Sequence, residues 1–386
     1  LIRGGEVFAP EPLGRKDVLL AGGLIEAVAE PGRLEAGSCG AEVVDATGAS
    51  VVPGLIDPHV HILGGGGEGG PATRAPEIRV EDIIGCGVTT VIGCLGTDGI
   101  TRQMPSLLAK ARALDLEGVS TFIFSGSYEV PVRTLTGSVR SDLVLIDKVI
   151  GAGEIAVSDH RSSQPTFDEI ARLAAECRVG GMLGGKAGVL HLHLGDGQRR
   201  LELLFRLIRE TEIPVTQVIP THITRNRDLF EQGLEWVAAG GSIDVTVGAE
   251  PAPGDPDVAF EEAIAAFERR GLPITRMTAS SDSNGSMPVF DAEGRLVRLT
   301  IASETDFLRK FREVVRKGLL PLETALRVFA ANAADFYKLG RKGRIEPGRD
   351  ADILVLDGGL GLVDVFARGR RMMAGGQLLA RGTFTA

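Results

Sequence analysis

The sequence has 386 residues, of which 44% are hydrophobic and 24% are charged, and its formal net charge is −9. A chain of this size and composition can bury a large core, and its acidic balance argues against nucleic acid or an anionic membrane as a partner. It has no uncharged apolar run of about 18 residues, so no transmembrane helix is expected, and no signal peptide is visible.

The four cysteines are scattered and show no Cys-x-x-Cys spacing (Cys39, Cys86, Cys94 and Cys177). This usage indicates reduced thiols and a cytoplasmic location rather than a disulfide framework or a cysteine zinc site. Cys86 and Cys94 flank an apolar strand pattern, so we expect both to fill the core.

The two ends of the chain both predict short strands. Residues 1–52 contain apolar runs separated by glycine pairs, as in a hairpin meander, and residues 343–386 show the same pattern. We therefore expect the ends to pair into one small β-sandwich domain, with the middle of the chain inserted between them.

Residues 53–342 alternate apolar strands with helical patterns. The expected strands are 55–62, 88–94, 120–125, 155–158, 189–194, 215–220, 242–247 and 277–281, and the expected helices include 104–116, 166–177, 199–210, 228–239 and 257–270. Eight such strands over this length predict an α/β fold with a TIM-like (β/α)8 barrel. A doubly wound open sheet is the alternative, but its nucleotide fingerprint is missing. The Gly64–Gly67 tract also lacks the Gly-Lys-Ser/Thr of a phosphate-binding loop.

Polar residues recur where the predicted strands end. His59 and His61 close the first strand, and side chains two apart share one face of a strand. A lone His-x-His is more often a pair of partly exposed histidines. Here further candidates stand at the ends of other strands, namely His193, His222 and Asp282. Because reactive groups of such a barrel sit at the carboxyl ends of its strands, we expect these residues to converge on zinc or another divalent ion.

Several nearby residues have simpler interpretations. His191 lies one layer deeper than His193 and is expected to be a packed core histidine, while His160 is expected to be structural and Asp57 to bond the backbone. Arg161 and Arg225 each lie within a few residues of a proposed ligand. A guanidinium can hold a carboxylate with two hydrogen bonds, so both arginines predict recognition of an anion.

The segment Pro53–His61 and the stretch GRIEPGRDAD (343–352) are similar to sequences of the amidohydrolase superfamily. Within it, the chain resembles the isoaspartyl dipeptidases, or β-aspartyl peptidases. The matching stretches are HVHILGGGGEGGP (59–71), LGTDGITR (95–102), SGSYEVPVRTLTGSV (125–139), SDHRS (158–162), HLGD (193–196), PTHITRN (220–226) and SSDSNGS (280–286). They cover every barrel loop except the seventh, and the combination is far more specific than any one of them.

This resemblance implies two zinc ions per chain, one held by His59 and His61 and the other by His193 and His222. Asp282 would bind metal and act as general base, and Tyr128, which by position alone is as well explained as a packed loop aromatic, would polarise the scissile carbonyl. The implied substrate contacts are Glu68 to the α-ammonium, Arg161, Arg225 and Ser286 to carboxylates, and Gly66 and Thr97 along the pocket. The family also suggests a homo-oligomer, in the form of an octamer.

One position departs from the family pattern. The family commonly has a carboxylated lysine on the fourth strand, where this chain has Glu154. The charge is the same, but the glutamate is shorter by roughly 3–4 Å. We expect Glu154 to bridge the two metals directly, and the alternative is a mononuclear site that Glu154 merely lines.

The reaction implied by the resemblance is attack of a metal-bound hydroxide on the isopeptide bond of a β-aspartyl dipeptide. Two alternatives are kept. One is a metal-dependent amidohydrolase acting on an N-acyl amino acid or a cyclic amide, which needs no ammonium anchor or pair of arginines. The other is an amidohydrolase-like assembly protein without activity, which the complete set of candidate ligands disfavours.

Overall fold

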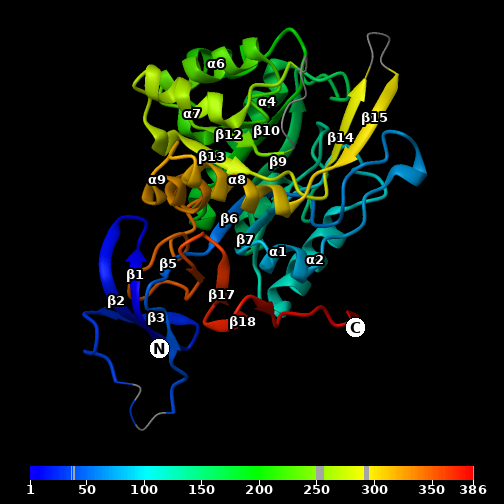
Figure 1. Cartoon of the computed structure of the whole chain (residues 1–386). Coiled ribbons are helices and arrows are strands. Elements are labelled where there is room, and N and C mark those ends of the chain that lie inside the picture. The colour runs from blue at the N-terminus through cyan, green and yellow to red at the C-terminus, as the bar shows by residue number, and fades with distance from the viewer. Residues whose placement is uncertain (36, 38–39, 249–255, 291–294, 386) are drawn as a thin grey trace.

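The computed structural model describes residues 1–35, 37, 40–248, 256–290 and 295–385, so the expectation for Cys39 falls outside the described residues. Figure 1 shows a large α/β part and a smaller strand-rich part, with the N-terminal residues in the smaller one. Cys86, Cys94 and Cys177 are buried and unpaired, as expected of core thiols.

Eight parallel strands form the centre of the larger part. They are β6 (Leu55–Val60), β7 (Val88–Gly93), β8 (Ser120–Ser125), β9 (Val149–Val157), β10 (Val189–Leu194), β11 (Val218–Thr221), β12 (Ile243–Thr246) and β13 (Met277–Ser280). Strands β6 to β11 form one curled parallel sheet, and β12 pairs with β13. Strand β12 lies beside β11 and β13 beside β6, and a parallel bridge joins Val60 to Ser283. The strands therefore follow one another as in the predicted TIM-like barrel.

The eight predicted strands are all present; β8 and β10 match the prediction at both ends, and the others have shifted ends. Strand β9 begins at Val149, six residues before its predicted start. The prediction missed this part because the small residues Gly151-Ala152-Gly153 interrupt the apolar pattern of the strand. Strand β11 begins at Val218, because Val215–Gln217 form a 3-10 turn. The carboxyl ends match the prediction more closely, and they carry the candidate site.

Helices cover the outside of the barrel. Their bounds are α1 (Val80–Ile84), α2 (Met104–Glu117), α3 (Val139–Leu145), α4 (Phe167–Gly184), α5 (Glu202–Glu210), α6 (Arg227–Ala238), α7 (Phe260–Arg269), α8 (Glu304–Arg316), α9 (Leu322–Leu326) and α10 (Asn332–Phe336). Helix α4 begins with a reciprocal capping box between Thr166 and Glu169, and the Asn226 side chain caps α6. Within the described ranges, no helix is both long enough and apolar enough to cross a bilayer.

The two chain ends pair in one mixed sheet, as the sequence predicts. Its strands are β1 (Ile2–Phe8), β2 (Pro12–Ala21), β3 (Leu24–Ala29), β4 (Val44–Asp45), β5 (Ser50–Pro53), β16 (Ile353–Leu356), β17 (Leu362–Ala367), β18 (Arg370–Ala374) and β19 (Gln377–Leu378). Strands β5 and β16 join the two ends in antiparallel register, with Val52 opposite Leu354. The sandwich form of this part and its boundaries at residues 52 and 343 remain predictions.

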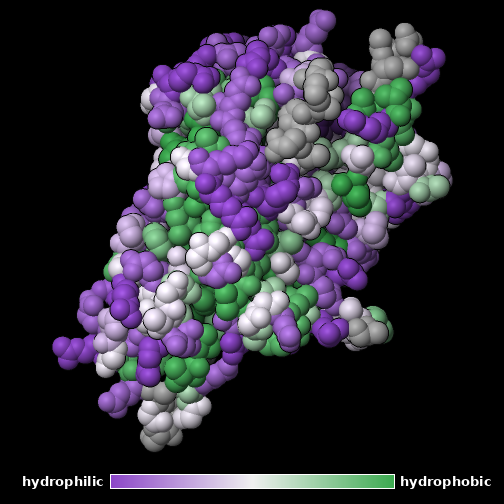
Figure 2. Space-filling view, in the orientation of Figure 1, coloured by the Kyte–Doolittle hydropathy of each residue, from purple (hydrophilic) through white to green (hydrophobic). Residues whose placement is uncertain are grey.

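A β-hairpin, β14 (Ser286–Phe290) and β15 (Leu296–Ile301), projects from the barrel just after the eighth strand. Its exposed side chains include Val289, Val297 and Ile301. Figure 2 shows apolar surface on this hairpin, while hydrophilic residues cover much of α6 and α7. The hairpin thus presents apolar surface close to the carboxyl ends of the barrel strands.

A buried cation joins the barrel to the strand-rich part. The Lys342 ammonium lies 2.7 Å from the Asp350 carboxylate and 2.6 Å from that of Asp352, which precedes β16. It also donates to the Ser120 hydroxyl at the start of β8, at 2.6 Å. All three charged side chains are buried, so this contact ties the two parts together in a region of weak solvent screening.

Replacing Lys342 with methionine is expected to lower the free energy of unfolding by about 3–5 kcal/mol, because it removes the buried cation that two buried carboxylates share and leaves Asp350 with only the exposed Arg341 as its ion-pair partner. Chemical denaturation of the purified protein measures the change. The exposed Lys338 offers a matched control, and Lys338→Met should shift stability by no more than about 0.5 kcal/mol. Equal effects of the two variants would show that the buried contact contributes little.

Candidate active site

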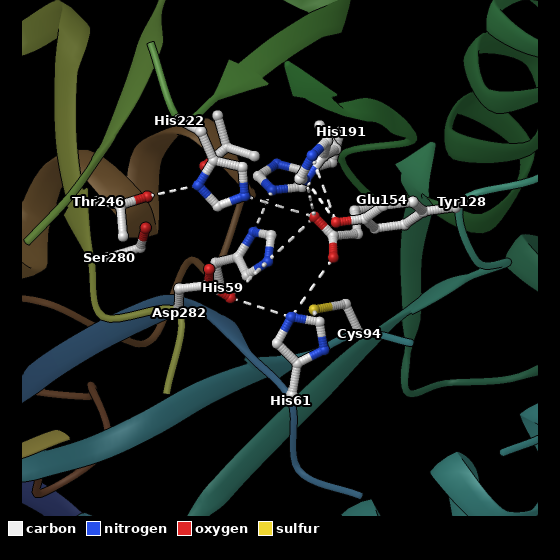
Figure 3. A network of polar contacts seen from close by, with 12 residues as sticks. His59, His61, Cys94, Tyr128, Glu154, His191, His222, Thr246, Ser280 and Asp282 are labelled. Atoms are coloured by element: carbon white, nitrogen blue, oxygen red, sulfur yellow. Dashed lines mark hydrogen bonds and ion pairs between the residues drawn. The ribbon is translucent and has the colours of Figure 1, made fainter. Parts of the chain in front are cut away.

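The six predicted metal ligands come together at the carboxyl ends of the barrel strands. All six are buried (His59, His61, Glu154, His193, His222 and Asp282). Figure 3 shows the labelled imidazoles and the Asp282 carboxylate around Glu154. Three overlapping groups have potential ligand atoms within 4.8 Å of one another: His59, His61, Cys94 and Glu154; His59, His222 and Asp282; and Glu154, His193 and His222.

Glu154 is the centre of this cluster. Its Oε2 lies 3.1 Å from Nδ1 of His193, 3.3 Å from Nε2 of His59 and 3.6 Å from Nε2 of His222. Its Oε1 lies 3.4 Å from Nε2 of His61. Burial raises the pKa of Glu154, but the surrounding imidazoles outweigh burial and hold that pKa well below its usual range. The two carboxylate oxygens therefore face different histidines.

Asp282 approaches the cluster from the loop after β13. Its Oδ1 lies 3.0 Å from Nε2 of His61 and 3.5 Å from Nε2 of His59. Burial raises the pKa of this carboxyl, while the His61 contact and the charges of His222 and His59 lower it to about 2. Asp282 is thus an ionised carboxylate inside the site.

The chemistry of these donors fits divalent cations. Among the described residues, Nε2 of His59 and Oδ1 of Asp282 are buried without a hydrogen bond of good geometry. Two buried carboxylates among these imidazoles require compensating positive charge in a region from which water is excluded. Imidazole nitrogens with carboxylate oxygens are also the donor set that zinc prefers.

Two of the histidines are held by residues that the sequence analysis did not assign. His193 turns Nδ1 towards Glu154 and contacts Asp159 through Nε2, 3.0 Å from Oδ2. His222 contacts the Thr246 hydroxyl through Nδ1, at 2.6 Å. Such partners fix the orientation of a ligating imidazole. Asp159 lies in the SDHRS stretch, so its motif offered a signal, whereas nothing in the sequence pointed to Thr246.

Two of the residues with simpler interpretations, Asp57 and His191, lie as predicted, while the structural role of His160 stays a prediction. Asp57 accepts backbone hydrogen bonds from His59 and Ser281, His160 is exposed, and His191 is fully buried beneath the cluster. Cys94 is buried as expected, but its sulfur also lies 3.9 Å from Nδ1 of His61, a contact that its role as core filler did not predict.

A pocket opens above the cluster. It is lined by His61, Gly65, Gly66, Glu68, Gly96, Thr97, Tyr128, Arg161, His193, Arg225, Asp282 and Ser286. All residues that the resemblance assigned to substrate contacts are in this set. Gly96 lets the backbone approach closely, since a Cβ there would lie 2.9 Å from Cε1 of His61.

Each charged group of the pocket contacts polar or charged neighbours. Ser286 and Thr97 donate hydrogen bonds of 2.9 Å to the Glu68 carboxylate. Arg161 makes two hydrogen bonds to Asp159, of 3.0 and 2.7 Å, and lies 3.5 Å from Glu68. Arg225 is more open, and its Nη1 lies 3.7 Å from Asp159. The pocket therefore offers one accepting carboxylate beside two guanidinium groups.

Tyr128 lies between the pocket and the cluster. Its hydroxyl lies 2.9 Å from Nδ1 of His193, and the Arg161 guanidinium stands 5.5 Å from the centre of its ring. Burial, together with the charge of Glu154, holds the pKa of Tyr128 well above its usual range. The phenol is thus protonated near neutral pH and can donate a hydrogen bond into the pocket.

The barrel and the histidine–carboxylate cluster at its mouth define the class of metal-dependent barrel hydrolases. The sequence profile of the amidohydrolase family matches residues 261–377. The solved β-aspartyl dipeptidase of Fervidobacterium islandicum AW-1, in complex with β-Asp-Leu dipeptide, is 47% identical with a TM-score of 0.92, and the match covers 99% of both chains. The chain therefore belongs to the amidohydrolase family and, within it, to the β-aspartyl dipeptidases.

More distant relatives share the fold. The dihydropyrimidinase of Brevibacillus agri NCHU1002 is 17% identical with a TM-score of 0.67 over 99% of this chain and 96% of that one. An adenine deaminase of Halalkalibacterium halodurans is 26% identical over 98% of this chain, which spans only 58% of that relative's length. An allantoinase of Salmonella choleraesuis is 22% identical over 92% of this chain and 85% of its own length.

Proposed function

We propose that this protein hydrolyses the isopeptide bond of β-aspartyl dipeptides at a pair of divalent cations, with zinc as the expected metal. One observation carries the proposal: a carboxylate, two guanidinium groups and three members of the buried ligand cluster line a single pocket. The related enzyme of Fervidobacterium islandicum AW-1, solved with β-Asp-Leu dipeptide, supports the same class of substrate.

The charges of the pocket match those of a β-aspartyl dipeptide. Such a substrate carries a free α-ammonium beside an α-carboxylate and ends in a second carboxylate. Glu68 would accept the ammonium, while Arg161, Arg225 and Ser286 would hold the carboxylates. Gly66 and Thr97 would line the walls. Bidentate contacts from arginine would fix both ends and place the amide over the cluster.

The ligands divide into two sets around Glu154. His59 and His61 would hold one cation and His193 and His222 the other. Glu154, which contacts members of both sets, would bridge the two cations. Bound cations of this kind lower the pKa of a water molecule and polarise a carbonyl oxygen. The alternative, a single cation with Glu154 lining the barrel, predicts one metal per chain.

Side chains of this protein would carry out the proton transfer and the hydrogen bonding. Asp282 would accept a proton from the attacking water and deliver it to the departing amine, since one carboxylate can serve as base and then as acid. Tyr128 would donate a hydrogen bond to the carbonyl oxygen as negative charge develops there. Both side chains line the pocket, so each is within reach of a bound amide.

A substrate panel tests the proposal. We expect kcat/KM for β-Asp-Leu to exceed that for N-acetyl-leucine and hydantoin by at least about 10⁴, because these analogues leave charged groups of the pocket unpaired. α-Asp-Leu carries the same charges but has its amide at a different position relative to them, so its kcat/KM should also be lower. Steady-state kinetics of the metal-loaded protein measure the ratios. Higher turnover of hydantoin or the N-acyl substrate would favour a cyclic amide or N-acyl amino acid instead, and absence of all turnover would favour a non-catalytic assembly role.

The cytoplasmic location and the homo-oligomer remain predictions. The unpaired thiols of Cys86, Cys94 and Cys177 support a reducing compartment. The apolar surface of the β14–β15 hairpin supports association of copies, and sedimentation analysis would measure the oligomer size.

A further inference from the structure

Three buried side chains, each in contact with the next, lie beneath the proposed metal centre. Nδ1 of His59 lies 2.9 Å from Nε2 of His191, as Figure 3 shows. Nδ1 of His191 in turn lies 3.2 Å from the hydroxyl of Tyr337. None of the three residues is more than 1% exposed. Tyr337 follows α10, so the contact connects β6, β10 and the last helical segment of the barrel.

His191 is fixed in place by its neighbours. The Phe124 ring stacks on its imidazole, with the ring centres 4.8 Å apart and the planes 12° apart. A charged imidazole enclosed in this way would be costly, so His191 carries a single ring proton. Its two nitrogens therefore have opposite roles, one as donor and one as acceptor.

The metal centre selects one direction for this chain of hydrogen bonds. Nε2 of His59 faces Glu154 and Asp282, and it can bind a cation only when it carries no proton. The His59 proton must then sit on Nδ1 and be donated to Nε2 of His191. His191 consequently carries its own proton on Nδ1, and the oxygen of Tyr337 accepts it.

We infer that His191 and Tyr337 form a tautomer lock that keeps Nε2 of His59 unprotonated and aimed at the metal position. The inference rests on the proposed metal centre and deepens it. His191 and Tyr337 are positioning residues, because they act on the metal only through His59. Loss of the Tyr337 hydroxyl would let the His191 proton move to Nε2, which would place the His59 proton on the atom that the metal needs.

Two measurements without substrate test the lock. In the zinc-loaded protein, ¹⁵N chemical shifts of the histidine rings report which nitrogen is protonated. We expect His191 in its Nδ1–H form in the wild-type protein, and the Nε2–H form there would reverse the direction of the hydrogen bonds and overturn the lock. Competition with a chelator should show that Tyr337→Phe and His191→Leu bind zinc 10–100-fold more weakly, as is usual when such a partner is lost.

The variant His191→Gln separates positioning from packing. Its amide oxygen can accept the Nδ1 proton of His59, so we expect zinc affinity within a few-fold of wild type, although the ring and its stacking on Phe124 are lost. Cys177→Ala, a truncation of a fully buried side chain in α4, should leave zinc affinity unchanged even if it lowers stability.

Wild-type zinc affinity in both His191→Leu and Tyr337→Phe would overturn the lock. Because neither measurement uses a dipeptide, both can still be interpreted if the protein fails to hydrolyse the substrate panel. Conversely, if the protein hydrolyses β-aspartyl dipeptides but these variants bind metal as tightly as the wild type, the lock is rejected and the proposed function is not.

Discussion

Replacing Asp282 with asparagine is expected to lower kcat for β-Asp-Leu by about 10²–10⁴-fold, the usual contribution of a positioned general base. The side chain is buried beside His61 and His59, with a pKa lowered to about 2. It is therefore ionised at every pH at which the enzyme would be assayed. Asparagine keeps the shape of the side chain but cannot take a proton from the attacking water.

The loss should fall on turnover rather than on binding. Asp282 is one of six candidate ligands, so we expect Asp282→Asn to retain metal by elemental analysis and to keep a KM near that of the wild type. The exposed Asp196, three residues after His193, offers the same change of charge outside the pocket, and Asp196→Asn should keep wild-type kcat. A near-normal rate in Asp282→Asn with bound metal would remove Asp282 from proton transfer.

The fold could be predicted from the sequence where apolar side chains mark a strand. Strands β8 and β10 match the prediction at both ends, because each is a compact apolar run bounded by polar or glycine residues. The start of β9 could not be predicted in this way, since Gly151 and Gly153 carry no side chain that shows a period. The sequence predicted that the two chain ends pair, but not which residues of β5 and β16 lie opposite each other, because register between distant strands is set by packing.

The candidate site was predictable for a related reason. Its ligands stand at strand ends, and the barrel brings those ends together whatever the distance along the chain. The partners of the ligands were harder to predict. Asp159 on His193, Thr246 on His222 and His191 on His59 are contacts to particular ring nitrogens. They depend on side-chain directions that strand spacing does not fix.

Glu154→Gln is expected to weaken metal binding by at least about 100-fold and to lower the metal content of the purified protein from two ions per chain to one or none. Loss of a mere partner of a ligand costs 10–100-fold, and Glu154 would be a ligand of both ions. Its two oxygens lie within 3.6 Å of a nitrogen on each of the four histidines. Glutamine keeps this size but removes the charge that offsets the cations.

Metal content by elemental analysis and affinity by chelator competition measure the effect, with Glu169→Gln as a control at an exposed position on α4. A single ion per chain in the wild type, unchanged in Glu154→Gln, would establish the mononuclear alternative. A glutamate is shorter than a carboxylated lysine by roughly 3–4 Å, so a bridge through Glu154 requires both ions to lie close to β9, where His193 and His222 already turn their nitrogens towards it.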